Sequence, residues 1–589
     1  MNLLDALQRF FTIEKLSKSS LLLNVASIVM GVIYIIVGAL GMDYIVLLWD
    51  IFGILILITF LENLSLVFIN NTTLNKGSKS GKRFNRVLNG YLIFYIIAIG
   101  LMYQGNWTLM TMYSNQLRDT FRSLLYIYVG YFGILGYGTV ISYYNVKNLN
   151  REELWDSSTS HGADHSISLR IFKFFLYLTL FLGLYFSYII IFGYYLEITA
   201  FIAGMIVPEL ALFLMLVFLS AAILLLKLQD KEVHPKRYKA IALMAIIISG
   251  AHLLPLFSTP YMVYGAEVNF ADAFGDGWHP KIDTDLEERY FMRSPFWLSG
   301  YFLGVPAKDC EYEKDVKFFD GKESNLEVDE EIELYFDVFW PTEVKNELPG
   351  VKEGKCAIII FIHGGAWRYG DKSGSKIPVS KYFVAQGYVV YDIQYGLKDV
   401  DFEALATPEH VKGDFDVNDM VRHIGNFTRY ISDDTNDYSA HKLDANLESV
   451  FVSGGSAGGH LTLATALGIN SGEYEDIFGT QIKIKGMIPL YPGHPDLEGD
   501  KELLYPERYL LEEDSPPCLI QQGTQDPGTG EVSLGIKKEY EEVGKEECCI
   551  LWLPFSGHSN DIYRPAYFNQ VFTYYMERFM YLCIEGEIE

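Results

Sequence analysis

Residues Gly454-Gly455-Ser456-Ala457-Gly458 read G-x-S-x-G and separate two segments of different character. The short apolar run Ser449–Ser453 before them predicts a strand, and Gly459–Ala466 after them predicts a helix. A serine hydroxyl becomes a useful nucleophile when a tight strand–turn–helix exposes it beside a base, with small neighbours that let the backbone turn sharply. The pentapeptide alone is a weak signal because Gly, Ala and Ser are common, so its meaning depends on a base, an acid and an oxyanion hole elsewhere.

The 589 residues divide into two parts of different composition. Residues 1–258 are rich in long apolar runs and hold 19 Lys+Arg and 14 Asp+Glu, whereas the rest of the chain holds 28 and 59. We predict a multi-pass transmembrane domain at 1–258, an aromatic-rich connector at 259–305 and a soluble acidic domain at 306–589. The connector suits either a segment lying on the membrane or packing against the soluble core. A net charge of −26 argues against nucleic acid as a partner, because phosphates would be repelled.

Seven segments of the first part are long and apolar enough to be membrane helices, which need about 20 such residues. They are Leu21–Leu40, Ile45–Phe68, Val87–Met102, Leu124–Tyr143, Phe172–Tyr194, Val207–Leu226 and Ala240–Phe257. Glu62 is the deepest carboxylate within them, and Glu209 follows Pro208 near the end of a span. Intramembrane charges are functional candidates, although a structural role is favoured for each one here.

Lys and Arg alternate between the two sides of these segments. Arg9, Lys15 and Lys18 lie at the N-terminus, the loops after the second, fourth and sixth spans are also basic, and the other loops hold few basic residues. The positive-inside rule then predicts a multi-pass cell-membrane protein, in contact with membrane lipids, with a cytoplasmic N-terminus and an extracytoplasmic C-terminal domain. That compartment permits disulfides, but the six cysteines indicate no particular pairing.

From about residue 306 the pattern alternates between strands and helices. The clearest helical patterns run from Asp416 to Ile431 and from Val532 to Val543. Alternation after the second strand predicts an α/β doubly wound, mostly parallel, eight-stranded sheet. The eight predicted strands are Tyr312–Phe318, Leu334–Trp340, Cys356–Ile362, Val389–Ile393, Val450–Ser453, Gly486–Tyr491, Cys518–Gln522 and Ile550–Leu553.

A loop of small residues, His363-Gly364-Gly365-Ala366-Trp367, follows the third predicted strand. Small side chains let backbone N–H groups approach the negative oxygen that develops on a carbonyl under attack. We expect the amides of Gly365, Ala366 and Ala457 to form this oxyanion hole. We also expect Trp367, Gly364 and Gly455 to border the bound substrate.

Three histidines follow Ser456 and are candidates for the general base. His460 lies on the first turn of the predicted helix, where packing or capping is the expected role. His494 follows the sixth strand, from which it could line the site. His558 follows the last strand, and a loop at the carboxyl end of that strand faces the active edge of the sheet. His558 is therefore the favoured base.

The acid that orients the base is expected after the seventh strand. Asp526 lies there and would accept the Nδ1 proton of His558, holding its tautomer. Asp561 is the main competitor, but it is only three residues past His558. The resulting chain order of Ser456, Asp526 and His558 is the order of the α/β-hydrolases.

These motifs make residues from about 306 to 589 resemble the hormone-sensitive-lipase-like and feruloyl-esterase-like (BD-FAE-type) branch of the α/β-hydrolases. The resemblance implies an esterase with carboxylic-ester substrates, no cofactor and no metal. Ala366 stands where the family's loop has a third glycine, and Tyr395-Gly396-Leu397 lacks the family's arginine. The segment after Asp526 also differs slightly from the usual loop. The stretches that carry the resemblance are Leu334–Pro341, His363–Trp367, Ser453–Leu461, Ser515-Pro516-Pro517 and Gly557-His558.

Three functions are compatible with this sequence. The favoured one is a membrane-tethered serine carboxylesterase or lipase-like hydrolase whose ester substrate includes lipids or cell-surface acyl esters. The second is a peptidase or amidase on the same scaffold, since a serine–histidine–aspartate arrangement serves both reactions. The third is a membrane sensor or transporter with a ligand-binding hydrolase-like domain, against which an intact set of motifs weighs. The sequence does not indicate an acyl length or an oligomeric state.

Overall fold

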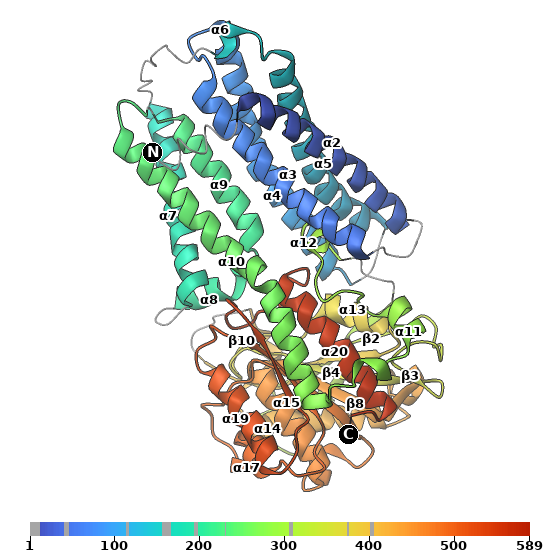
Figure 1. Ribbon diagram of the computed structural model, residues 1–589. Helices are drawn as coiled ribbons and strands as arrows, with labels where there is room; N and C mark the ends of the chain where they lie inside the picture. Colours follow the sequence, from blue (N-terminus) through green and yellow to red (C-terminus); the bar gives the residue numbers. More distant parts are fainter. Residues whose placement is uncertain are drawn as a thin grey trace.

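The computed structural model describes residues 12–39, 46–113, 117–155, 167–193, 198–229, 231–305, 310–373, 376–400 and 406–588. In these residues the chain forms a helical half and an α/β half (Figure 1). Several predictions lie outside the described residues, namely the span ends at Leu40, Ile45 and Tyr194, the basic Arg9 and the domain boundary at residue 306.

The helical half consists mainly of long apolar helices. Six of its described helices are long and apolar enough to cross a membrane, and there are up to seven spans if α8 and α9, bent by 105° at their break, count as one. Each of the seven predicted segments overlaps one of these helices. The helices are α2 (Ile13–Ala39), α3 (Val46–Thr73), α4 (Lys79–Thr111), α5 (Leu117–Lys147), α6 (Glu152–Trp155), α7 (Ile167–Phe192), α8 (Ile198–Ile206), α9 (Ala211–Lys227) and α10 (Pro235–Phe274).

Buried polar side chains join α2 to α3 inside this half. Asn24 and Asn63 exchange two amide hydrogen bonds of 2.7 and 2.8 Å, and Ser20 donates to Asn63 Oδ1 at 2.9 Å. Glu62 accepts a hydrogen bond from Ser19. Polar side chains of this kind stabilise helix pairs in an apolar environment, because their alternative is an unsatisfied group.

Helix α10 passes from one half of the molecule into the other (Figure 1). It continues beyond the predicted end at Phe257 to Phe274 although it contains Pro255 and Pro260. Near its end the Asn269 side chain donates to the carbonyl of Ile550 in the sheet at 2.9 Å. A single continuous helix therefore links the two halves.

The predicted connector packs between the halves. Tyr301 stacks on Tyr567 of the α/β half with a centroid distance of 5.3 Å, and Phe302 lies against Phe60 of α3 at 5.8 Å. Both aromatic side chains are fully buried. Packing on the soluble core, the second of the two predicted placements, is thus observed for Tyr301, whereas Phe302 packs against the helical half. The connector contains α11 (Thr284–Tyr290) and α12 (Leu298–Leu303).

The α/β half is built on one large sheet of the order β1-β2-β5-β4-β8-β9-β10-β11, with β3 paired to β4. All eight predicted strands are present, and β3 is an additional short one. The sheet is mixed: five of its eight strand pairings are parallel, as expected for a mostly parallel sheet, and three are antiparallel, which the sequence did not specify. β1–β2, β2–β5 and β3–β4 are antiparallel and the remaining neighbours are parallel. The strands are β1 (Glu311–Asp320), β2 (Glu333–Trp340), β3 (Val351–Lys352), β4 (Lys355–Ile362), β5 (Val389–Ile393), β8 (Ala445–Gly455), β9 (Ile484–Leu490), β10 (Cys518–Gly523) and β11 (Cys548–Leu553), with β6 (Leu397–Lys398) and β7 (Lys412–Gly413) in a separate pair.

Helices cover both faces of this sheet and create two cores. Side chains of β4 alternate between them, as the pleat requires: Ile359 and Phe361 join the core that continues into the helical half, whereas Ile358 and Ile360 join the opposite core. On the first face lie α10, α13 (Ile377–Val384) and α20 (Tyr567–Glu585), and on the second α14 (Val417–Ser432), α15 (Ala457–Ser471) and α19 (Thr529–Glu542). Three short helices lie between α15 and α19 along the chain: α16 (Glu475–Phe478), α17 (Lys501–Leu504) and α18 (Pro506–Tyr509).

The cysteines of the α/β half contribute to packing. Cys356, Cys518, Cys548, Cys549 and Cys583 are buried thiols, and no disulfide forms among the described residues. Burial raises the pKa of the Cys356 thiol to about 12, so that it stays protonated and unreactive.

Candidate active site

Ser456 occupies the sharp turn between β8 and α15. Its backbone has φ 58° and ψ −116°, a conformation that is costly for a residue with a side chain. The amide of Ser456 donates to the carbonyl of Leu490 at 2.9 Å, which ties the turn to the end of β9. The strand–turn–helix predicted around the pentapeptide is therefore present, with the serine at its tip.

The glycines of the pentapeptide are required by close backbone contacts. A Cβ at Gly458 would lie 2.1 Å from the carbonyl oxygen of Ile362 and 2.7 Å from that of His363. A Cβ at Gly455 would lie 2.5 Å from the Tyr491 hydroxyl. The first helix turn thus packs directly on the end of β4, and this contact brings the oxyanion loop beside Ser456.

We expect Gly458→Ala to lower the free energy of unfolding by about 3 kcal/mol, because rigid backbone must move to admit the methyl group. Thermal unfolding in detergent would measure this loss. Gly535→Ala in α19 is the matched control, since nothing lies within 4 Å of its added Cβ and alanine favours a helix over glycine by about 1 kcal/mol. Equal unfolding temperatures for the two variants would contradict the packing argument.

His558 and Asp526 lie in line behind Ser456. His558 Nε2 is 2.8 Å from Ser456 Oγ, and His558 Nδ1 is 2.7 Å from Asp526 Oδ2. All three residues come from loops at the carboxyl ends of strands β8, β10 and β11. His558 and Asp526 are each 8% exposed, so bulk water does not separate them. The geometry is that of a nucleophile, a base and an orienting acid.

Hydrogen bonds between their loops hold the acid next to the base. The amide of Gln525 donates to Ser556 O at 2.9 Å, and that of Thr524 donates to Leu553 O at 3.0 Å. These bonds extend the parallel pairing of β10 and β11 beyond the strands. The position of the carboxylate therefore follows from the sheet register.

The predicted oxyanion loop lies against the serine turn. Gly364 is so close that an added Cβ would be 3.3 Å from Ser456 Cβ. Gly365 and Ala366 have φ of 125° and 53°, and within the described part of the chain their amides donate to no protein acceptor. Ala457 begins α15, where the first amides lack helical partners. Gly365 and Ala366 thus follow a glycine that lies against the serine turn, and Ala457 is next to Ser456 in the chain.

Trp367 is buried and donates its indole N–H to His460 Nδ1 at 3.3 Å. His460 also contacts the carbonyl of Leu503 at 2.9 Å, and burial lowers its pKa to about 4. His494 lies 3.2 Å from Glu507. Neither histidine is placed beside Ser456 Oγ as His558 is.

A buried carboxylate pair, Asp337 and Asp392, holds the segment that follows the predicted oxyanion loop. Asp392 accepts a hydrogen bond from the amide of Ser373 at 2.7 Å. Asp337 accepts a hydrogen bond from the Ser373 hydroxyl at 2.5 Å and forms an ion pair with Lys372 at 2.7 Å. Tyr113, at the end of α4, also donates to Asp337 at 2.6 Å. Burial, together with the charge of Asp337, raises the pKa of Asp392 to about 7.

This pKa predicts a pH-dependent stability. Because the pKa of Asp392 is higher in the folded chain than its ordinary value of 3.8, its stabilising contribution is complete below about pH 4 and is lost as the pH rises through about 7. When the pH rises from 5 to 8, the free energy of unfolding of wild type should therefore fall by about 2–3 kcal/mol more than that of Asp392→Asn. Unfolding midpoints at both pH values measure the difference, with exposed Asp434→Asn as the control. If the unfolding midpoints of wild type and Asp392→Asn changed equally with pH, Asp392 would not be the source of the pH dependence.

Tyr491 is a neighbour of the base that sequence reasoning did not single out. Its ring lies edge-on to His558 with centroids 4.8 Å apart, and its hydroxyl donates to Asp561 Oδ1 at 2.5 Å. Asp561 in turn pairs with Lys376 at 2.5 Å. Asp561, the sequence-based competitor of Asp526, is therefore engaged on the other side of Tyr491.

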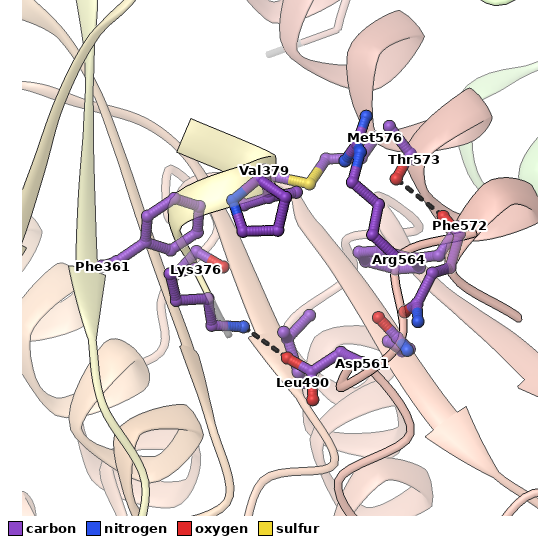
Figure 2. A pocket seen from close by; sticks show the side chains of 13 residues that line it. Phe361, Lys376, Val379, Leu490, Asp561, Arg564, Phe572, Thr573 and Met576 are labelled. Atoms are coloured by element: carbon purple, nitrogen blue, oxygen red, sulfur yellow. Dashed lines mark hydrogen bonds and ion pairs between the residues drawn. The ribbon is translucent and has the colours of Figure 1, made fainter. Parts of the chain in front are cut away.

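Figure 2 shows the Lys376–Asp561 pair at the edge of a small cavity of about 30 Å³ between β4 and α20. This volume suits one or two waters. The lining combines polar ends, including Arg564 and Asn569, with apolar Phe361 and Phe572. The cavity shares Asp561 with the hydrogen bond from Tyr491. Among the described residues, no group of His, Cys, Asp and Glu could hold a metal ion.

The helical half contacts the loops that carry Asp526 and His558, which sequence reasoning also missed. The Phe201 ring of α8 lies 5.5 Å from that of His558, and the Gln525 side chain donates to the carbonyl of Ile190 at 2.9 Å. Glu209, at the α8–α9 bend, accepts the amides of Ile562 and Tyr563 at 3.1 and 2.6 Å. The only sequence signal for these contacts was Glu209 itself, an acidic residue beside Pro208 in an apolar run.

The order of strands and helices in the α/β half is that of an α/β-hydrolase fold. Residues 347–498 match the family model described as BD-FAE, which confirms the resemblance drawn from the motifs. The chain is 22% identical over 237 residues to a probable carboxylic ester hydrolase, LipM, of Mycobacterium tuberculosis. The match spans 36% of this chain and half the length of that relative.

Solved esterases are also similar to this domain at low identity. The apo form of Thermogutta terrifontis esterase 2 is 18% identical with a TM-score of 0.33, over 48% of this chain and 98% of that one. Esterase B from Lactobacillus rhamnosis is 19% identical with a TM-score of 0.32, over 44% and 81%.

Proposed function

We propose that this protein is a membrane-tethered serine carboxylesterase, with Ser456 as nucleophile, His558 as general base and Asp526 as the orienting acid. The observation that carries the proposal is the continuous pair of contacts, 2.8 Å from Ser456 Oγ to His558 Nε2 and 2.7 Å from His558 Nδ1 to Asp526 Oδ2. The name of the mycobacterial relative, a probable carboxylic ester hydrolase, supports the same reaction class.

In the proposed reaction His558 accepts the hydroxyl proton while Ser456 Oγ attacks the ester carbonyl. The amides of Gly365, Ala366 and Ala457 stabilise the oxyanion of the tetrahedral intermediate. Collapse breaks the bond to the alcohol, which leaves with the proton from His558, and Ser456 retains the acyl group. Water, deprotonated by His558, then releases the carboxylic acid and restores the serine. Asp526 keeps the histidine in the required tautomer and stabilises its charge.

We further propose that the helical half spans a membrane and that the hydrolase domain is extracytoplasmic. The contact from Lys227 to Asn85 at 2.9 Å and that from Asn75 to Leu154 at 2.8 Å bring three basic loops to one end of the helices. Contacts of Tyr113 and Ile190 with the hydrolase domain lie at the other end. This separation agrees with the positive-inside pattern.

The esterase proposal is tested by turnover of a p-nitrophenyl ester series by the full chain in detergent, beside p-nitroanilides of the same acyl groups. We expect ester turnover that disappears in Ser456→Ala, with anilide turnover much slower. Faster anilide turnover would favour the amidase alternative. Absence of serine-dependent turnover with every acyl length would refute the hydrolase proposal and leave the binding alternative.

The topology is tested separately by fusing alkaline phosphatase or green fluorescent protein to the C-terminus. We expect phosphatase activity and no fluorescence, because alkaline phosphatase needs an oxidising compartment to form its disulfides. The opposite pattern would place the hydrolase domain in the cytoplasm.

A further inference from the structure

Helix α8 (Ile198–Ile206) lies directly beside the proposed catalytic base. The Phe201 ring is 5.5 Å from the His558 ring, with 34° between their planes. Because α8 and α9 are bent by 105° at their break, α8 runs across the end of the helical half and does not continue α9 through it. In Figure 1, α8 is found at the end of α7 that faces the α/β half. The proposed site therefore lies at the boundary between the two halves.

The surface leading away from His558 along α7 and α8 is apolar. Ile190, Val207 and Ala211 form a buried cluster, against which Ala203 and Phe555 pack. Phe555 lies three residues before His558 in its loop. This cluster joins the base to the ends of the helices.

Beyond that cluster the apolar surface becomes open. Ile202 and Ile206 of α8 are 47% and 37% exposed, and Phe192 at the end of α7 is 58% exposed. From Phe174 to Phe192, and throughout α8, the sequence contains no Asp, Glu, Lys, Arg or His. A charged substrate group would lose hydration on such a surface without compensation.

Hydrogen bonds hold α8 in this position from two sides. At the bend, Glu209 accepts the amides of Ile562 and Tyr563 and the side chain of Asn569 at 3.1 Å. At the end of α7, Gln525 donates to Ile190 O. Glu209 is 1% exposed, so these bonds are shielded from water. The two loops that carry Asp526 and His558 are thus fastened to the segments that flank α8.

We propose that the ester cleaved at Ser456 carries a long acyl chain that lies in the bilayer, and that α8, with Phe201 at its centre, is the apolar wall along which this chain reaches the site. The inference rests on the esterase function proposed above and names its substrate class. Each methylene buried against the wall strengthens binding about fourfold.

The charge of the chain indicates which lipid headgroups fit. Residues 259–589 carry 59 acidic against 28 basic residues. They would repel anionic headgroups, so the class is a neutral lipid ester, such as a glyceride.

The test uses the full chain reconstituted in phosphatidylcholine vesicles. It compares kcat/KM for 4-methylumbelliferyl oleate dissolved in the vesicles with that for soluble 4-methylumbelliferyl butyrate. We expect Phe201→Ala to lower the oleate-to-butyrate ratio about tenfold or more and Phe201→Leu to restore it to within about threefold, since leucine replaces most of the apolar surface. Phe174→Ala is the matched control, because this aromatic residue of α7 is 64% exposed and lies near the helix's opposite end. Its ratio should equal that of wild type.

The outcomes separate this inference from the esterase proposal. An unchanged ratio in Phe201→Ala, with butyrate turnover that still depends on Ser456, would overturn the lipid inference and leave the esterase standing. An equal fall for both esters would also overturn it, because Phe201 would then only position His558. Absence of Ser456-dependent turnover of either ester would instead refute the esterase proposal itself.

Discussion

Ser456→Ala is expected to lower kcat for ester hydrolysis by about 10⁶-fold, the scale seen when a serine hydrolase loses its nucleophile. The physical reason is that the attacking oxygen is removed while the proposed base and oxyanion hole remain. A p-nitrophenyl ester assay of the full chain measures the loss. A fluorophosphonate probe, which bonds covalently to an activated serine, should label wild type and fail to label the variant.

Ser471→Ala is the matched control for this experiment. Ser471 ends α15, the helix that begins after Ser456. Its hydroxyl donates to Gly468 O at 3.2 Å and accepts the amide of Glu473 at 3.3 Å, both local contacts at the helix end. We expect full labelling and turnover close to wild type in this variant. Labelling that persists in Ser456→Ala would mean that another residue is the nucleophile.

Asp526→Asn is expected to reduce kcat by about 10⁴-fold with little change in KM, because the amide can hold the histidine in the wrong tautomer. In the wild-type chain Asp526 Oδ2 lies 2.7 Å from His558 Nδ1. The substitution keeps the size and shape of the Asp526 side chain but removes its negative charge. Single-turnover kinetics would assign the loss to acyl transfer and exclude slow product release as its cause. Thermal unfolding would show whether the fold is retained.

Asp561→Asn tests the alternative acid. Asp561 bonds Tyr491 and Lys376, so its replacement should mainly cost stability, about 3–5 kcal/mol for a buried ion pair that loses one partner. Its effect on kcat should be far smaller than that of Asp526→Asn. A larger loss of kcat in Asp561→Asn would reverse the proposed assignment of the acid.

The helical half is more closely joined to the hydrolase domain than a tether needs to be. Glu209, Phe201 and Ile190 contact the loops of His558 and Asp526, and α10 enters the α/β half as one unbroken helix. Changes in the helices would therefore reach the catalytic loops directly. For this reason the full chain, and not the α/β half alone, is the appropriate protein for every assay above.

Much of the α/β half could be predicted from sequence, because its signals are local. A fully buried strand such as Cys356–Ile362 must be apolar throughout, and a serine turn needs small residues at fixed offsets. The eight strands and the α/β-hydrolase fold were predicted on this basis and are confirmed. The antiparallel β1 and β2 were not predicted, since strand direction within a sheet depends on partners far along the chain.

The candidate site divides in the same way. Ser456, His558 and Asp526 could be nominated by their positions after predicted strands, because carboxyl ends of parallel strands meet at one edge. Tyr491 and Phe201 could not be, since each has an ordinary local sequence and reaches His558 only through folding. Glu209 stood out as a charge in an apolar run, but its partners Ile562 and Tyr563 are far along the chain and could not be predicted.

By itself the sequence determined the order of the elements, the serine turn and the division into an apolar and an acidic part, because hydrophobic period and small-residue spacing act over a few residues. Only the tertiary structure decided that the sheet is mixed, that α10 continues from one half into the other and that α8 lies against His558. These features arise from packing between segments up to 357 positions apart, a separation that no local pattern encodes.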